Sequence, residues 1–521
     1  MRLLRRKVVP SKTLIDEVQN GVLSEQYAEL EKLRQELSTL RPMQENLIGS
    51  LAELLTKVWL TPSNKQHDKL FFDDPVWGHT CMDEELADLF FHPLIQRLNH
   101  IKQLSFAYLR FPNATHSRLA HTLGTCRNME VSLTTMFRNN WLYKATGRES
   151  IPLDPTARRE LILKAKAAAL LHDVGHAPFG HTLDKFIGYF DPARPLPSPD
   201  KHYSRKYFNE FLHAHLPSAI HSGNLAGLLA QDQISLSGWD TLVADLLDSP
   251  LDADRMDFLV RDAHMTGLLM GVTSTEALIE RMCPFQDEDR VFLAFDKSCL
   301  PYVKDFLVAR EEMYALCYEH PPKLAAERIF TRLIENLLRE HNLALDTVML
   351  LTDEQVLALL GLAAVTSLET SQLLSALLQN VEYTKVLEVD LTNNTNALIS
   401  EWNIARLTPR MGRWAYVDWS SEREKAIAIA AGIGEQNKWR VLVAIPDQRT
   451  GVPPALNVKI LEKAAPGYAV KNIFDIDSGM QKKLEDANKA RQKIRIFADS
   501  RLDPQQIKEV AEAARNMFES H

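Results

Sequence analysis

The sequence predicts a mainly α protein, with an all-helical core, an N-terminal helical segment and a small C-terminal α+β lobe. Three observations carry this prediction. Apolar residues recur at helical spacing through most of residues 24–380. Beyond about residue 395 the pattern changes, with short β-like runs at residues 440–445 and 493–497. Within the helical region, three histidines and two aspartates crowd into residues 172–184, directly after an apolar, alanine-rich run.

The chain has 521 residues, which is too many for one ordinary hydrophobic core. We divide it into an N-terminal segment (residues 1–65), a helical core (66–395) and a C-terminal lobe (396–521). The lobe combines the two β-like runs with an amphipathic helix over residues 504–519, whose first residue is a proline.

Composition narrows the class of protein. Hydrophobic residues make up 45% of the chain and the formal net charge is −8, as in an ordinary globular protein. Nothing global indicates nucleic acid, although a basic pocket inside an acidic protein leaves that partner open. The five cysteines form no CxxC pair, which argues against a disulfide framework or structural zinc. With no run of about 18 apolar residues and no signal-peptide pattern, we expect a cytoplasmic protein with no membrane partner.

The N-terminal segment shows a heptad pattern. Its apolar positions follow three-four spacing, with Gln44 in the gap: Leu30, Leu33, Leu37, Leu40, Leu47, Leu51, Leu54 and Val58. Pro42 is expected to divide the stretch into two helices, because proline is tolerated in a first helical turn. The two helices either form a hairpin packed on the next domain or provide an oligomer contact.

Residues 170–184 are the candidate metal site. His172 and Asp173 close the alanine-rich helix, which Gly175 and Pro178 are expected to break. Imidazole and carboxylate together suit a divalent transition metal, Mg²⁺ or Mn²⁺. A single histidine at a helix end is more often structural than a ligand, but this density favours a site. The remaining candidates in the stretch are His176, His181 and Asp184.

Two adjacent ligands do not make a cage, and two further segments supply the others. Residues 111–124 contain His121, with Arg118 three residues earlier on the same helix face. Residues 251–262 contain Asp254. Together they give an H…HD…D pattern, in which three separate helices bring four ligands to one ion.

This pattern and the longer segments around it resemble the HD-domain metal-dependent phosphohydrolases, and most of all the deoxynucleoside triphosphate triphosphohydrolases (dNTPases), which include animal members. The resemblance covers roughly residues 70–385, is faint near residues 493–502 and is absent from the N-terminal segment. It implies an HD core that holds one divalent ion (Mn, Fe, Mg or Zn) and splits a dNTP into a deoxynucleoside and tripolyphosphate. It further implies a homo-oligomer of two, four or six copies, and a role in controlling dNTP pools or in antiviral or antiphage defence.

The resemblance also assigns roles to individual residues. The implied metal ligands are His121, His172, Asp173 and Asp254. The implied groups for acid–base catalysis, or for orienting it, are His181, His202, Asp184 and His176, the last also a candidate for phosphate. Arg118 and Arg310 are implied phosphate contacts. The implied sugar-site residues are Gln103 at the 3′-hydroxyl, Leu104 on the 2′ side and Tyr318, and Asp262 and Phe258 are further implied substrate-binding residues. Phe258 stands where relatives often have a tyrosine, so a hydroxyl contact there is lost.

Two alternative functions remain open. One is another HD enzyme, a phosphodiesterase or a phosphatase for a different nucleotide. The Gln103-Leu104 pair, and the eight-residue spacing of Arg310 and Tyr318, weigh against it. The other is a non-catalytic nucleotide sensor or binding module on an HD scaffold, against which the complete ligand set weighs.

Activation by a guanine nucleotide is a property of the animal members, in which an aspartate and an arginine read the guanine between subunits. Aligned on Gln103-Leu104, those two places hold Phe91 and Asn99 here, and Asp73 replaces an asparagine near the triphosphate. Phenylalanine accepts no hydrogen bond and asparagine lacks the arginine charge. We therefore expect no guanine-specific activation of the animal type, although another nucleotide could activate through a rebuilt site.

Overall fold

The computed structural model describes most of the chain, and every structural statement here concerns the described residues. They are residues 41–61, 70–183, 199–220, 222–230, 236–269, 274–341, 343–391, 415–445 and 458–519. The heptad positions before Arg41 and the candidate residue Asp184 lie outside the described residues.

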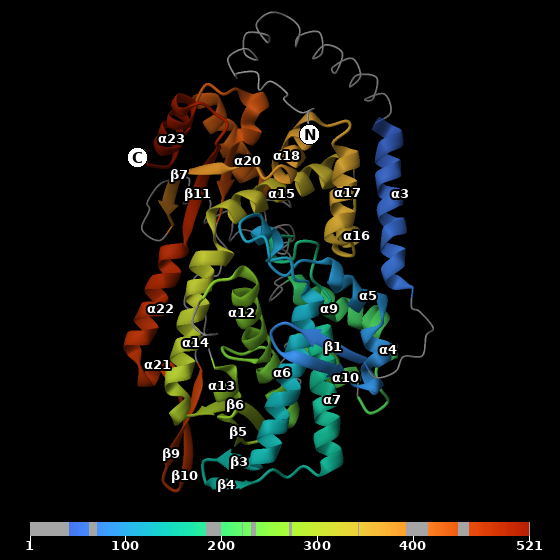
Figure 1. Cartoon of the computed structure of the whole chain (residues 1–521), viewed down its shortest axis with the longest axis vertical. Coiled ribbons are helices and arrows are strands. Elements are labelled where there is room, and N and C mark those ends of the chain that lie inside the picture. The colour runs from blue at the N-terminus through green and yellow to red at the C-terminus, as the bar shows by residue number, and fades with distance from the viewer. Residues whose placement is uncertain are drawn as a thin grey trace, which may run out of the picture.

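Helices dominate, so the predicted mainly α class is confirmed (Figure 1). The helices that precede the β5–β6 hairpin are α3 (Arg41–Leu60), α4 (Ala87–Phe90), α5 (Pro93–Gln96), α6 (Arg118–Asn139), α7 (Pro155–Leu171), α9 (Pro199–Tyr207), α10 (Ser222–Ala230), α11 (Trp239–Leu247), α12 (Ala253–Thr266) and α13 (Thr275–Ile279). Those that follow it are α14 (Leu300–Met313), α15 (Pro321–Glu340), α16 (Leu345–Met349), α17 (Asp353–Ala363), α18 (Leu368–Leu378), α20 (Ala415–Ala430), α21 (Ile473–Ile476), α22 (Ser478–Arg491) and α23 (Pro504–Glu519). The strands are β1 (Leu70–Asp74), β2 (Gly78–Met82), β3 (Trp141–Lys144), β4 (Gly147–Ser150), β5 (Met282–Asp287), β6 (Arg290–Asp296), β7 (Tyr383–Asp390), β8 (Val441–Ala444), β9 (Lys459–Ala464), β10 (Gly467–Asn472) and β11 (Lys493–Asp499).

Helices α6, α7 and α12 pack together at the centre of the core. The Ser117 side chain caps α6 by accepting the N–H of Ala120, and Asp154 caps α7 with Pro155 in the first turn. The alanines of the last turns of α7 are fully buried, and their small side chains allow neighbouring helices to approach. The start of α6, the end of α7 and the start of α12 therefore meet at one place.

A six-stranded sheet lies at one end of the molecule, at the bottom of Figure 1, with strand order β10-β9-β6-β5-β3-β4. Strands β9 and β10 come from the predicted C-terminal lobe, and β9 pairs in parallel with β6 of the core. This sheet crosses the predicted boundary between residues 395 and 396. The domain limits themselves remain a prediction.

A second sheet has the order β7-β11-β8, with β8 and β11 from the predicted C-terminal lobe, and both outer strands run antiparallel to β11. One of its faces packs against α20 and α23 through Val441, Val443 and Ile494. Leu442 and Phe497 point the other way, into the main hydrophobic core. The sheet is thus buried on both faces. The β-like runs that the sequence shows are β8 and β11, and the predicted helix over residues 504–519 is α23.

Helix α3 packs on α5, α16 and α17 through a face that includes the fully buried Ile48 and Ala52. Its other face leaves Leu47, Leu54 and Val58 exposed by 56%, 60% and 58%. The helix begins at Arg41, so Pro42 lies in its first turn, as predicted. A hairpin and an oligomer contact both remain predictions, because the upstream heptads lie outside the described residues.

Residues 92–104 are apolar at helical intervals and so predict a helix that ends in Gln103-Leu104, and this prediction is wrong at its end. Helix α5 passes into a 3₁₀ turn at Arg97–His100, and Ile101 is extended, with φ −123° and ψ 119°. The N–H of Gln103 then bonds the carbonyl of His116 at 2.9 Å, so this segment pairs with the residues that precede α6 instead of continuing the helix.

No described helix is long and apolar enough to cross a membrane.

Candidate metal centre

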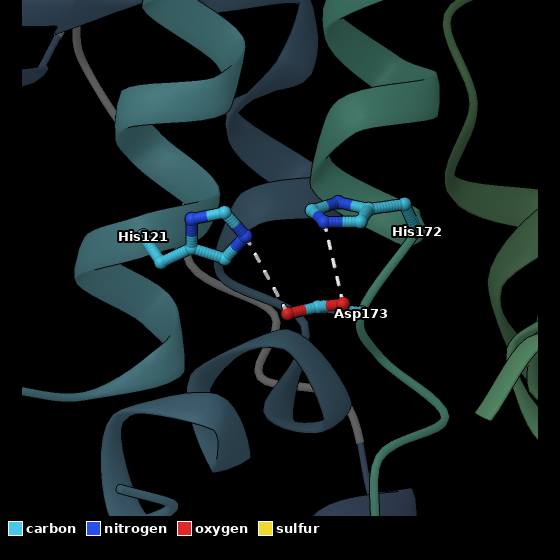
Figure 2. A group of neighbouring side chains, drawn as sticks. All are labelled: His121, His172 and Asp173. Carbon is cyan, nitrogen blue, oxygen red and sulfur yellow. Dashed lines mark ion pairs between the residues drawn. The ribbon is translucent and has the colours of Figure 1, made fainter. Parts of the chain in front are cut away.

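Three predicted ligands face one another at the meeting point of α6 and α7 (Figure 2). His121 lies in the first turn of α6, His172 caps the end of α7, and Asp173 follows directly. One ligand atom from each lies within 4.8 Å of the others. The Nε2 atoms of His121 and His172 lie 3.8 Å and 3.3 Å from opposite oxygens of Asp173.

Asp254 completes the predicted set from the first turn of α12. Its Oδ1 lies 2.9 Å from Nε2 of His121 and 3.7 Å from Nε2 of His172. The structure therefore brings the four predicted residues together from the ends of α6, α7 and α12. Asp252 caps α12 by accepting the N–H of Arg255, and this cap fixes the helix start that carries Asp254.

The electrostatics of the cluster suit a cation. Burial opposes charge on His121, but hydrogen bonds to Asp254 and Asp257 raise its pKa to about 10. Burial likewise opposes ionisation of Asp254, yet contacts with His121 and His172 hold its pKa well below the ordinary value. In this geometry the carboxylates of Asp173 and Asp254 are ionised, and a positive charge between them stabilises them. The buried Nε2 of His172 makes no hydrogen bond within the described part of the chain. Two imidazoles and two carboxylates thus form a donor set that fits a divalent ion.

A further layer of contacts orients the imidazoles. Nδ1 of His172 lies 2.7 Å from the carbonyl oxygen of Ala169, and Nδ1 of His121 lies 2.8 Å from Oδ2 of Asp257. If these partners take the Nδ1–H, each Nε2, once deprotonated, can direct its lone pair at an ion in the centre. A Cβ at Gly124 would lie 1.7 Å from Oδ1 of Asp257, so only glycine lets this carboxylate approach α6.

Asp257 is itself fixed from two sides. Arg261 donates to both of its oxygens at 2.9 Å, and the Trp77 indole donates to Oδ1 at 2.5 Å. Arg261 also donates to Asp74, in the hairpin of β1 and β2. The sequence indicates Asp257 only as a helix salt-bridge partner. The structure adds its contact with His121, one turn beyond Asp254.

Arg118 lies inside the cluster rather than on the surface. Only 1% of it is exposed, and Nη1 donates to Oδ2 of Asp173 at 2.8 Å. Nε and Nη2 make no hydrogen bond to any described residue, so two donor groups remain open to an anion. Gly180, with φ +51°, passes so close that a Cβ there would lie 2.4 Å from Nη2.

Of the described candidate acid–base residues, His176 contacts the HD pair, His172-Asp173, directly. Nε2 of His176 lies 3.1 Å from Oδ1 of Asp173, and the His176 ring meets the exposed His181 ring edge-on at 4.7 Å. His202 lies on α9 against the ring of Tyr203. We call residues 172–183 the HD segment. The hydroxyl of Ser204 joins α9 to this segment by donating to the carbonyl of His172 at 2.8 Å.

The candidate sugar-site residues form a second group. Oε1 of Gln103 is buried without a hydrogen bond to any described residue, and Leu104 is 6% exposed. Tyr318 donates to Oδ2 of Asp262 at 2.8 Å, and Oδ1 lies 2.8 Å from Nε2 of His116. Asp262 thus bridges two side chains. The Phe258 ring lies between the two groups, 6.3 Å from that of His121 and 6.5 Å from that of Tyr318.

Arg310 is 7% exposed and stands against the Tyr314 ring, at 5.1 Å. Its Nη1 lies 3.4 Å from Glu311, and its buried Nε makes no hydrogen bond within the described chain. These contacts place Arg310 beside the turn that ends at Tyr318. They do not include a residue of the metal cluster.

Two residues that the sequence did not indicate, Arg97 and Asp353, fix the backbone of the HD segment through hydrogen bonds. Fully buried Arg97 donates to the carbonyl oxygens of Val174 at 3.0 Å and His176 at 2.7 Å. Asp353 accepts the N–H of Phe179 at 2.6 Å and of Lys102 at 3.0 Å. The only available signal was an arginine inside the apolar pattern of residues 92–104, and an aspartate after a threonine cap at residue 352.

Comparisons with known proteins agree with this geometry, although no family model matches the chain. The chain is 31% identical over 284 residues to the uncharacterized protein YwfO of Bacillus subtilis, covering 54% of this chain and 59% of that protein. It is 25% identical over 284 residues to the deoxynucleoside triphosphate triphosphohydrolase SAMHD1 of Homo sapiens, covering 48% of this chain and 41% of that protein. The resemblance to HD-domain, dNTPase-like proteins is confirmed. The match spans about half of the length of these relatives.

The fold is shared with a phosphohydrolase of Bacteroides thetaiotaomicron, with a TM-score of 0.59 at 20% identity over 83% of this chain and 100% of that chain. At this identity the similarity concerns the fold alone. The HD pair of the present chain is His172-Asp173, and the ligand types of the H…HD…D pattern are all in place around it.

Proposed function

We propose that the chain is a metal-dependent phosphohydrolase that converts a dNTP and water into a deoxynucleoside and tripolyphosphate. The observation that carries the proposal is the cluster of His121, His172, Asp173 and Asp254, with Arg118 bonded to one of its carboxylates. An ion held there would act as a Lewis acid toward a phosphoryl oxygen and make a water molecule more acidic. The resemblance to SAMHD1 supports the dNTP as substrate.

The residues around the cluster have chemically distinct tasks in this proposal. Arg118 offers two N–H groups without a described partner to the triphosphate, and His176 and His181, whose rings meet edge-on, are assigned the task of holding or donating a proton to the leaving oxygen. The unbonded Oε1 of Gln103 is available to the 3′-hydroxyl, and Leu104 fills the 2′ side. A 2′-hydroxyl would be buried there against an apolar side chain without a partner, which disfavours ribose.

A nucleotide panel tests the proposal. Each dNTP and rNTP is incubated with the protein in Mg²⁺, Mn²⁺, Fe²⁺ or Zn²⁺, with and without added GTP, and the phosphate products are identified. We expect release of tripolyphosphate from dNTPs in at least one metal, a clear preference over rNTPs, and no strict requirement for GTP. Release of another phosphate product would favour the phosphodiesterase or phosphatase alternative. Binding without turnover in every metal would establish the nucleotide sensor.

A further inference from the structure

Buried polar side chains form a series of hydrogen bonds next to residues of the proposed sugar site. Oγ of Ser105 lies 2.7 Å from Oγ1 of Thr182, which donates to Oε1 of Glu327 at 2.9 Å. Nζ of Lys323 donates to the same Oε1 at 2.5 Å and to the carbonyl oxygen of Tyr318 at 3.1 Å. We call Ser105, Thr182, Glu327 and Lys323 the hydroxyl relay.

The protons of the relay can point in only one direction. An ionised carboxylate only accepts, so Thr182 must donate to Glu327, and Ser105 must in turn donate to Thr182. All four side chains lie in residues that are less than a tenth exposed, where a polar network is stabilising only if its members are satisfied. Removing one hydroxyl therefore disturbs the groups on either side of it.

Ser105 also carries backbone strain. Its φ is +53°, a left-handed conformation that a serine adopts at a cost, and its hydrogen bond to Thr182 holds it there. Strain of this kind persists only where the surroundings impose it. Ser105 directly follows Leu104, so the bond to Thr182 restrains the backbone next to Leu104.

Each part of the relay adjoins a residue of the proposed site. Ser105 follows Leu104, Thr182 follows His181, and Lys323 bonds the carbonyl of Tyr318. We propose that the hydroxyl relay is a positioning device that holds Leu104 in register with the HD segment and so sets the discrimination between deoxyribose and ribose. This inference rests on the proposed function, in which Leu104 fills the 2′ side.

Two substitutions break the same link from opposite sides. Ser105→Gly removes the hydroxyl, while glycine adopts a positive φ without strain. Thr182→Val removes the other hydroxyl and keeps the side-chain shape. The matched control is Thr370→Val on α18, where an equally buried hydroxyl accepts a hydrogen bond from Asn336 at 3.2 Å, outside the proposed site.

The test measures binding and turnover separately. Calorimetry gives the affinities for imido analogues of one deoxyribonucleoside and one ribonucleoside triphosphate, and kinetics give kcat and KM for the corresponding substrates. We expect either single substitution to reduce the deoxyribose preference by about tenfold, as displacement of a positioning group does. The double variant should lose no more than one single variant, because both remove one shared interaction. Thr370→Val should keep the preference.

The outcomes separate this inference from the proposed function. If both variants keep the wild-type preference while losing stability as Thr370→Val does, the relay is merely structural and the inference fails. An unmodified protein that binds both analogues equally also overturns it. If the unmodified protein prefers the deoxyribose analogue but hydrolyses neither substrate, the proposed function fails, and loss of that preference in the variants would still support the relay.

Discussion

Opposite charges, rather than apolar packing, hold the candidate metal cluster together at the scale of single residues. His121 lies between Asp254 and Asp257, while Arg118 and His176 contact the two oxygens of Asp173. Histidine must lose its proton to bind a metal, so an ion at the centre would replace the imidazolium charge that balances the carboxylates here. Removing a single ligand should therefore affect metal content before it affects the fold.

Asp173→Asn and His172→Ala test this expectation. Each change removes one ligand of the cluster and leaves the apolar core around α6 and α7 intact. We expect metal affinity to fall by about tenfold or more, with loss of turnover, while the circular dichroism spectrum stays unchanged. Elemental analysis of the purified variants measures the metal.

The control for this experiment is His213→Ala, an exposed histidine in the short turn after α9. It should keep both metal and activity. A variant at Asp173 or His172 that retains the full metal content and full turnover would remove that residue from the ligand set.

Asp353 gives stability a specific pH dependence. Burial raises its pKa from the ordinary 3.8 to about 6, although the N–H groups of Lys102 and Phe179 favour its charged form. A carboxyl whose pKa is higher in the folded state binds its proton more tightly when folded. Its contribution to stability is therefore complete below about pH 4 and is lost as the pH rises through about 6.

Urea unfolding of the wild type and of Asp353→Asn, from pH 4 to pH 7, isolates this group. The free energy of unfolding of the wild type should fall relative to that of the variant as the pH rises through this window. His92, whose pKa burial lowers to about 4, titrates in both proteins and cancels in the difference. A difference that is flat, or that grows with pH, would show that Asp353 does not titrate in this way.

The site residues that lie close together in the chain could be predicted from the sequence, and those with distant partners could not. His172, Asp173 and His176 are ligand types close together in the chain, so their pattern is visible without a structure. Arg97 bonds a carbonyl 254 residues later, and Asp353 bonds backbone N–H groups of two distant segments. Nothing about an isolated arginine or aspartate indicates such partners, because those contacts exist only once the chain has folded.

At the scale of elements, the HD segment after α7 depends on contacts from other parts of the chain. Arg97, in the 3₁₀ turn after α5, holds the carbonyls of Val174 and His176 and also that of Leu351. Backbone carbonyls without a partner are costly in the interior. The planar fork of one guanidinium thus fixes a segment that has no regular secondary structure of its own.

Arg97→Lys should destabilise this segment, because an ammonium group cannot reproduce the planar fork. We expect the free energy of unfolding to fall by about 2 kcal/mol or more, with a loss of turnover, because buried carbonyls lose their donors. Arg138→Lys is the matched control. Its pair with Glu280 is exposed, so we expect a change of about 0.5 kcal/mol or less. Equal effects of the two changes in urea unfolding would refute the role of Arg97.

Among the helices and strands, those whose limits are set by nearby residues could be predicted, and those that depend on other contacts could not. Helices such as α6, α7 and α23 follow from local spacing, caps and prolines. The end of the predicted helix at residues 92–104 could not be foreseen, because a pairing with the residues before α6 replaces the helical hydrogen bonds. Strand β5 was missed although it forms a hairpin with the adjacent β6, because it contains Pro284, and β9 was missed because it joins the sheet beside the distant β6.

At the scale of the whole molecule, the C-terminal lobe joins the helical core through a buried ion cluster. Glu424 of α20 is fully buried and accepts two hydrogen bonds from Arg328 of α15, at 2.7 Å and 3.0 Å. Arg332 lies 3.3 Å from it, and the N–H of Val443 in β8 donates to it at 2.8 Å. One carboxylate therefore connects α15, α20 and β8.

Glu424→Ala should weaken this junction strongly. It leaves the buried Arg328 and Arg332 without their shared partner, and we expect a loss of about 3–5 kcal/mol in the free energy of unfolding. The control is Glu422→Ala on the same helix, where the side chain is 71% exposed and a change within about 0.5 kcal/mol is expected. If Glu424→Ala unfolds at the same urea concentration as its control, the junction does not stabilise the molecule.

Product analysis in isotopically labelled water tests most directly which bond of which substrate the protein breaks. The metal-loaded protein is incubated with a single dNTP, and the products are separated by ion chromatography and weighed by mass spectrometry. We predict equal amounts of deoxynucleoside and tripolyphosphate, with the oxygen of water in the tripolyphosphate, as attack on the α-phosphorus requires. A monophosphate with pyrophosphate, a diphosphate with phosphate, or no hydrolysis in any of the four metals would contradict the account.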